Sequence, residues 1–144
     1  MIKKAGIGDI ENIASLAILL WNECTLEGLI DEFSKLISKE NVGFFIKYEK
    51  DVPIGFAQCQ LRYDYVEGTD TSPVGYLEGI FVKEDYRCKG YARLLLSECL
   101  KWAKEKGCKE FASDCEIDND SSFKFHKAMG FKEVNRIICF TKKL

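Results

Sequence analysis

Two strand-like patterns joined by one long helical pattern constrain the fold of this chain more than any other feature. The first, Gly75 to Lys83, is rich in aromatic and β-branched residues, and the second runs from Lys109 to Glu116. Between them, apolar residues recur at helical spacing from Ala92 to Ala103, which predicts an amphipathic helix. A helix that connects two strands of one sheet makes them parallel and the crossover right-handed. The sequence therefore predicts a parallel strand pair with a helix across one face.

The remaining strand patterns are joined by hairpin-like turns, which predicts antiparallel pairing. Gly79, inside the first parallel strand, indicates a β-bulge or a close backbone approach. The expected fold class is α/β, in the α+β sense of a central mixed, mostly antiparallel sheet flanked by helices, as one domain over residues 1–144. Further strands are expected at Ile2–Ala5, Phe44–Tyr48, Ile54–Tyr63 and, as a final hairpin, Phe131–Lys143; further helices are expected after the N-cap residues Asp9 and Thr25 and at Ser121–Met129.

The loop between the central strand and its helix has the composition of an anion site. Arg87, Lys89 and Gly90 directly precede the helix, whose first N–H groups have no intrahelical partner and carry the positive end of the helix dipole. The loop is neither a Walker A motif nor a dinucleotide fingerprint. An anion site and an ordinary solvated turn both remain open on these residues alone.

Composition narrows the class of protein. Apolar residues make up 47% and charged residues 31% of the chain, with a net charge of −2, so nucleic acid is not the expected partner. No apolar run approaches the ~20 residues of a membrane span. The seven cysteines include no Cys-x-x-Cys pair, and there is one histidine, so neither a disulfide framework nor a metal site is expected. The cysteines are interpreted as reduced cytoplasmic thiols.

Acidic residues gather near the C-terminal ends of the parallel strands. Asp114 stands where α/β sheets bind ligands. Glu78 lies within a strand between Leu77 and Gly79, where a carboxylate needs either a function or a partner, and a buried salt bridge to an arginine is the alternative. Helix capping is favoured for Asp118 and Asp120, which precede Ser121.

The residues from Arg87 to Ala92 match the Arg/Gln-x-x-Gly-x-Gly/Ala loop of the Gcn5-related N-acetyltransferases, and the chain resembles that superfamily. It is most similar to the type I aminoglycoside 6′-N-acetyltransferases, over nearly its whole length. The strings that carry this closer resemblance are Arg62–Val66, Ser72–Pro73, Leu77–Val82, Gly107–Cys108, Ala112–Asp114 and Gly130–Phe131.

The resemblance implies direct transfer of an acetyl group from acetyl-CoA to the 6′-amino group of an aminoglycoside in a ternary complex, and hence antibiotic resistance. The coenzyme would enter between two splayed parallel strands, and the enzymes of this family are often homodimers. The resemblance also implies substrate contacts for Trp21, Tyr65, Glu78, Asp114 and the residue at Asn135. Catalytic roles are expected for Glu78 and Asp114 on chemical grounds, because the attacking amine must lose a proton and either carboxylate could accept it, through water. The family residue at Asn135 is commonly acidic, so its charge is lost here. His126 is kept out of the catalytic set. Cofactor binding is implied for Ile80, Phe81, Val82, Arg87, Cys88, Lys89, Gly90, Tyr91, Ala92, Arg93 and Asn119.

Two other functions stay open at this point. The same fold acetylates other cationic amines, such as a polyamine, a small metabolite or a protein N-terminus. A non-catalytic acetyl-CoA sensor is the alternative from another class, and the retained carboxylates Glu78 and Asp114 argue against it.

Overall fold

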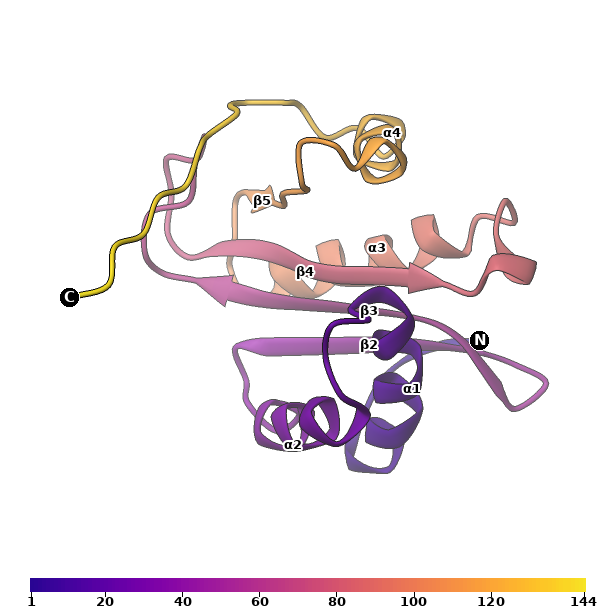
Figure 1. Ribbon diagram of the computed structural model, residues 1–144. Coiled ribbons are helices and arrows are strands. Elements are labelled where there is room, and N and C mark those ends of the chain that lie inside the picture. The colour runs from indigo at the N-terminus through magenta and orange to yellow at the C-terminus, as the bar shows by residue number, and fades with distance from the viewer.

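The computed structural model describes residues 1–144, built around a five-stranded sheet in the order β1-β2-β3-β4-β5 (Figure 1). All neighbouring strands are antiparallel except β4 and β5, which are parallel, so the predicted mixed sheet is confirmed. The strands are β1 (Ile2–Lys4), β2 (Val42–Glu49), β3 (Val52–Arg62), β4 (Val74–Val82) and β5 (Phe111–Ala112). The α-helices are α1 (Ile10–Leu20), α2 (Leu26–Leu36), α3 (Tyr91–Glu105) and α4 (Asp120–Ala128).

Helices cover both faces of the central strands, and each face has its own apolar core. On one face, α1 and α2 pack on Phe44, Ile46 and Phe56, and on the other α3 packs on Phe45 and Ala57. The alternation follows from the period of two in a strand. Figure 1 shows α1 and α2 below the sheet and α4 on the opposite side, above β5. No helix combines the length and the apolarity needed to cross a bilayer.

Strand β4 carries the predicted bulge, and the extra residue is Glu78. Gln58 on β3 is paired with Gly79, and the next residue of β3, Cys59, is paired with Leu77. A bulge bends the strand and re-aims the side chain of the extra residue. Gly79 is also a close approach, because a Cβ there would lie 2.5 Å from Cζ2 of Trp21.

The prediction of a long strand from Lys109 to Glu116 is wrong, because β5 contains only Phe111 and Ala112. These residues pair with Gly75 and Tyr76 at the start of β4. Beyond Ala112 the chain diverges from β4, although the sequence pattern continues. The edge of β4 from Leu77 to Val82 therefore has no strand beside it.

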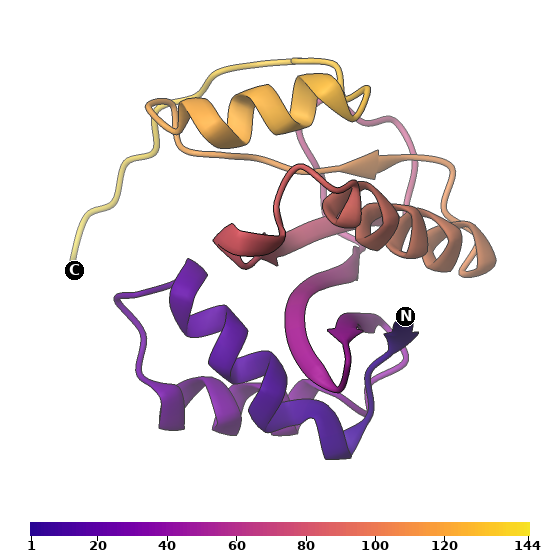
Figure 2. The same cartoon turned by 90° about the vertical axis from the view of Figure 1, so that its right-hand side faces the viewer.

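The predicted hairpin from Phe131 to Lys143 is also wrong. Residues 132–144 contain no strand and make no backbone–backbone hydrogen bond. The apolar side chains in this segment resemble those of a strand, but the chain offers no pairing partner, and Ile137, Ile138 and Phe140 are exposed. Figure 2 shows the segment crossing above α4 and then running free to the C-terminus.

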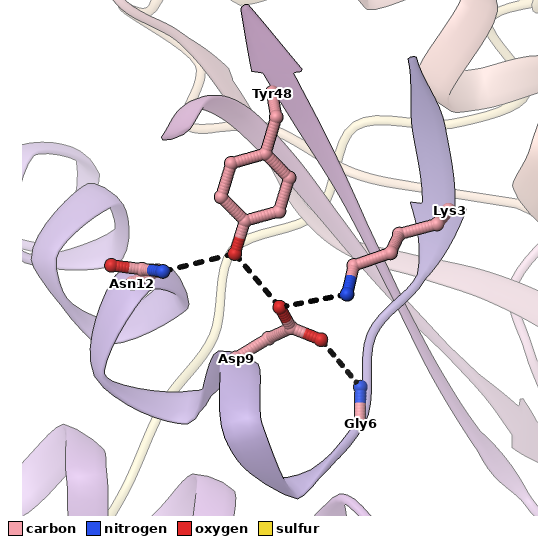
Figure 3. A network of polar contacts seen from close by, with 5 residues as sticks. All are labelled: Lys3, Gly6, Asp9, Asn12 and Tyr48. Atoms are coloured by element: carbon pink, nitrogen blue, oxygen red, sulfur yellow. Dashed lines mark hydrogen bonds and ion pairs between the residues drawn. The ribbon is translucent and has the colours of Figure 1, made fainter. Parts of the chain in front are cut away.

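Thr25 caps α2 as predicted, accepting a hydrogen bond from the Gly28 N–H at 3.1 Å, whereas Asp9 does not cap α1. Asp9 lies at the end of a short 3₁₀ turn, and its carboxylate turns back to accept from the Gly6 N–H at 2.9 Å and the Tyr48 hydroxyl at 2.7 Å (Figure 3). Lys3 Nζ lies 3.1 Å from the same carboxylate. The side chain ties β1 and β2 to the start of α1.

Replacing Asp9 with Asn is expected to reduce the free energy of unfolding at pH 7 by about 1–3 kcal/mol, because a buried network loses a charged acceptor. Burial raises the pKa of Asp9, but the hydrogen bonds from Gly6, Tyr48 and Lys3 outweigh it and bring the pKa below its ordinary value. The contribution is therefore present above the unfolded pKa of ~3.9 and is lost as pH falls through the lower folded pKa.

Urea unfolding at pH 7 and near pH 2 measures this, with Asp31→Asn as the control, since Asp31 makes an exposed i,i+4 pair with Lys35. The difference in the free energy of unfolding between wild type and Asp9→Asn should be smaller near pH 2 than at pH 7. An equal difference at both pH values would contradict an ionic origin.

Candidate active site

The bulge residue Glu78 lies in a polar cluster on the α1 face of the sheet, with 18% of its side chain exposed. Arg62 at the end of β3 donates from Nη2 to both carboxylate oxygens of Glu78, at 2.8 and 2.9 Å. The salt bridge that the sequence left open as an alternative for Glu78 is therefore present. The ion pair compensates the charge of a mostly buried carboxylate, which still keeps a part of its surface exposed.

Arg62 and Tyr76 connect Glu78 to Asp114. The Arg62 Cζ lies 3.5 Å from the centre of the Tyr76 ring, and the Tyr76 hydroxyl donates to Oδ2 of Asp114. Burial, followed by the hydrogen bond to Asp114, raises the pKa of Tyr76 well above its ordinary value. Tyr76 therefore remains protonated and keeps Asp114 in place. The two carboxylates proposed from the sequence belong to one connected group.

A cavity of about 310 Å³ opens beside Glu78, between the sheet, the residues that follow α1 and one side of α2. Trp21, which follows α1, forms an aromatic wall over Gly79. Its ring lies edge-on to that of Phe56, with the ring centroids 6.0 Å apart. The other lining residues are Glu23, Cys24, Leu29, Glu32, Gln58 and Glu78. An aromatic wall with three carboxylates suits a cation.

Sequence reasoning found Trp21 and Glu78 but missed Glu23, Glu32 and Gln58. Glu23 follows Trp21 by two residues, so its closeness in sequence to a predicted substrate contact could have identified it as part of the site. Glu32 and Gln58 look like ordinary helix and strand residues, and the packing of α2 against the sheet brings them to the cavity.

Two predicted substrate contacts do not line this cavity. Tyr65 is 76% exposed in the connection between β3 and β4. Asn135 donates to Glu67 at 2.8 Å, which holds residues 132–144 against that same connection. Their contact with substrate stays a prediction.

A larger cavity of about 430 Å³ lies on the other face, between β1 and α3. Lys3, Lys4, Lys101 and Lys106 line it together with Glu98 and Glu105. Its predominantly basic lining is unsuited to a cationic substrate. No group of three or more His, Cys, Asp or Glu side chains is placed to hold a metal ion.

The loop before α3 presents an uninterrupted run of free donors. Every backbone N–H from Cys88 to Arg93 lacks an acceptor within the chain, and no side chain caps the helix. Gly90 has φ +81°, with nothing within 4 Å of the position its Cβ would occupy, and Cys88 also has positive φ. Arg87 secures the loop by donating from Nε to the carbonyl of Val82 at 2.8 Å. This geometry is suited to a phosphate group.

The open edge of β4 adds two further donors. Lys83 N–H points toward β3, where it donates to the Ile54 carbonyl at 2.8 Å. Because N–H directions alternate along a strand, those of Ile80 and Val82 point away from β3, toward the gap beside β5. By the same alternation, the N–H of Phe81 points toward β3 and not toward the gap. A cofactor contact of Phe81 stays a prediction.

Asn119 caps α4 and accepts a hydrogen bond from the Ser122 N–H at 3.1 Å. The prediction that Asp118 or Asp120 caps this helix is therefore wrong. The carboxamide oxygen of Asn119 is thus occupied, and a cofactor contact through this side chain stays a prediction. His126 bridges the carbonyl of Ser122 and the hydroxyl of Ser113, at 2.7 and 2.8 Å. It touches neither Glu78 nor Asp114.

Residues 10–131 match the Acetyltransferase (GNAT) family. This chain belongs to that family. It is an acetyltransferase by family, and the resemblance stated from the sequence is confirmed.

The acetyltransferase matches relatives over nearly the whole length of both chains. It is 37% identical over 134 residues to aminoglycoside N(6′)-acetyltransferase type 1 of Salmonella enteritidis, covering 93% of this chain and 92% of the relative. It is 34% identical to the protein of that name from Acinetobacter haemolyticus, covering 99% and 98%. The solved structure of AAC(6′)-Iy with a bisubstrate analogue, CoA-S-monomethyl-acetylneamine, superposes with a TM-score of 0.95 at 35% identity, covering 100% of this chain and 98% of that one.

Proposed function

We propose that this acetyltransferase transfers the acetyl group of acetyl-CoA to the 6′-amino group of an aminoglycoside, directly and within a ternary complex. The observation that carries the proposal is the acidic cavity at Glu78, beside the open edge of β4 and the free N–H groups before α3. The names of the relatives support the same reaction. Acetylation removes the charge of one substrate amine, so the activity would confer resistance.

The residues present fit acetyl-CoA. The thioester supplies an activated acetyl group. The N–H groups from Cys88 to Arg93 would hold the pyrophosphate, with Lys89 adding charge. The N–H groups of Ile80 and Val82 are directed into the gap between β4 and β5, where they would bind the pantetheine arm or polarise a carbonyl oxygen.

Glu78 and Asp114 would remove the proton from the attacking amine. An ammonium group cannot act as a nucleophile, so a proton must pass to an acceptor, directly or through one water. Both carboxylates also attract the amine. Arg62 keeps Glu78 oriented through two hydrogen bonds from Nη2. Trp21 would pack against a sugar ring, and neutral Asn135 would weaken contacts with a distant amine.

Thiol release from acetyl-CoA tests the reaction and its position. We expect turnover with tobramycin, which has a 6′-amine, and none with an aminoglycoside that has a 6′-hydroxyl. Turnover with both would refute the regiochemistry. Turnover with spermidine or a peptide N-terminus alone would replace the aminoglycoside with another cationic amine. Coenzyme binding without any turnover would favour a sensor.

We also propose that the acetyltransferase is a cytoplasmic homodimer. The exposed apolar residues Ile137, Ile138 and Phe140 of the unpaired C-terminal segment support a partner surface, which a second copy would cover. The free cysteines, none of which is paired, are compatible with a reducing compartment. The molecular mass in solution, by sedimentation, tests the dimer, and a monomer at micromolar concentration would refute it.

A further inference from the structure

Gln58 is a buried residue whose side-chain amide has no hydrogen-bond partner in the protein, although the amide atoms themselves are accessible. Only 7% of the residue is exposed, and its side chain neither donates to nor accepts from any group of the chain. It lies on β3 opposite Gly79, directly beside the bulge residue Glu78. Its side chain lines the 310 Å³ cavity. Because its amide atoms are accessible, they can be reached from the cavity that holds Glu78.

Trp102 Nε1 is the one fully buried side-chain polar atom without a hydrogen-bond partner, so the amide atoms of Gln58 are not enclosed but face the open cavity. Phe56, two residues earlier on the same face of β3, shows that the sheet accommodates an apolar side chain there. The strand pattern itself would favour an apolar residue at position 58. A polar side chain at this position leaves a donor and an acceptor available to a ligand in the cavity.

The lining of the cavity indicates which ligand group Gln58 contacts. Glu23, Glu32 and Glu78 are acceptors when ionised, so they select ammonium groups. A hydroxyl group is best satisfied by a side chain that both donates and accepts, as a carboxamide does. In an aminoglycoside with a 6′-amine, that amine is on the exocyclic carbon C6′, and hydroxyls of the same ring lie a few bonds away. This arrangement matches an amide placed next to a carboxylate.

We propose that Gln58 determines substrate specificity by hydrogen bonding a hydroxyl of the ring that bears the 6′-amine. The assignment rests on the proposed function, because it takes the reacting amine to lie at Glu78. The hydroxyls of that ring are then the substrate groups nearest to Gln58. The role is recognition, and the proton transfer stays with Glu78 and Asp114.

Gln58→Leu tests the assignment, with Gln60→Leu as the matched control. Gln60 is the same residue type on the same face of β3, but it does not line the cavity. For Gln58→Leu we expect kcat/KM for kanamycin B to fall about 10- to 100-fold, the range for one lost substrate hydrogen bond. The KM for acetyl-CoA should not change, and the melting temperature should stay or rise. Gln60→Leu should leave kcat/KM within about threefold.

A second substrate separates recognition from a general disturbance of the cavity. The 3′,4′-dideoxy form of kanamycin B lacks two hydroxyls of the ring, so Gln58→Leu should lower its kcat/KM less than about threefold. Equal losses on both substrates, or no loss on either, would overturn the assignment while leaving the proposed function intact.

Calorimetry keeps the two proposals distinguishable if wild type proves inactive. Kanamycin B binding to the CoA-loaded wild type, weakened at least tenfold in Gln58→Leu, would support the role of Gln58 and refute the acetylation. Absence of binding by wild type would refute both.

Discussion

Replacing Glu78 with Gln is expected to lower kcat for acetyl transfer to an aminoglycoside by about 10²- to 10⁴-fold, the range for loss of a general base. The amide keeps the shape of the side chain and one oxygen for Arg62, but it no longer accepts a proton from the amine. The KM for acetyl-CoA should stay unchanged, because the donors from Cys88 to Arg93 lie in a separate loop. Thiol release at saturating concentrations of both substrates measures the effect.

Glu32→Gln is the control for Glu78. Glu32 lines the same cavity from α2 but lies outside the group that Arg62 and Tyr76 connect. Its substitution should raise the KM for the aminoglycoside and leave kcat within a few-fold. Equal kcat for wild type and Glu78→Gln would remove Glu78 from the chemistry and leave it as the salt-bridge partner of Arg62.

Gly90→Asp should raise the KM for acetyl-CoA about 10²-fold, with Gly90→Asn much closer to wild type. Gly90 has φ +81° directly before α3, in a conformation that Asn and Asp tolerate better than other side chains. Both fit sterically, because nothing lies within 4 Å of the Cβ position. The Asp variant alone places a negative charge where the pyrophosphate would bind. Repulsion between a carboxylate and a phosphate about 4 Å apart near a protein surface amounts to a few kcal/mol.

The two Gly90 variants differ by one charge, so the ratio of their KM values isolates the electrostatic part. That ratio should fall as ionic strength rises, because salt screens exposed charges. Equal KM values for the Asp and Asn variants would mean that the pyrophosphate binds elsewhere, and the loop before α3 would then be an ordinary turn.

The parts of the site that local chemistry determines were predictable. The loop before α3 combines a glycine, cations and a helix start within a few residues, and Gly79 marked the bulge. The partner of Glu78 was not predictable, because Arg62 becomes its neighbour only through the pairing of β3 with β4. The same applies to Gln58 and Glu32, whose roles depend on which face of the sheet α2 covers.

The wrong predictions concern elements whose existence depends on a partner. Residues 109–116 and 131–143 have strand composition, but a strand also needs a neighbour with free backbone groups. Phe111 and Ala112 find that neighbour at the start of β4, and the residues after them do not. Asp9 has the composition of a cap, yet Gly6, Tyr48 and Lys3 compete successfully for its carboxylate.

The bulge in β4 interrupts the regular pairing of the sheet and places the Glu78 carboxylate. Because Glu78 is the residue without a counterpart on β3, deleting it would let Leu77 and Gly79 follow one another in an uninterrupted ladder with Cys59 and Gln58. A chain shortened in this way would gain a regular sheet and lose its best-placed carboxylate. The same deletion would remove the ion-pair partner of Arg62. The irregular strand is therefore the structural condition for having a carboxylate at this point of the sheet, and a sheet of regular pairing could not present one there.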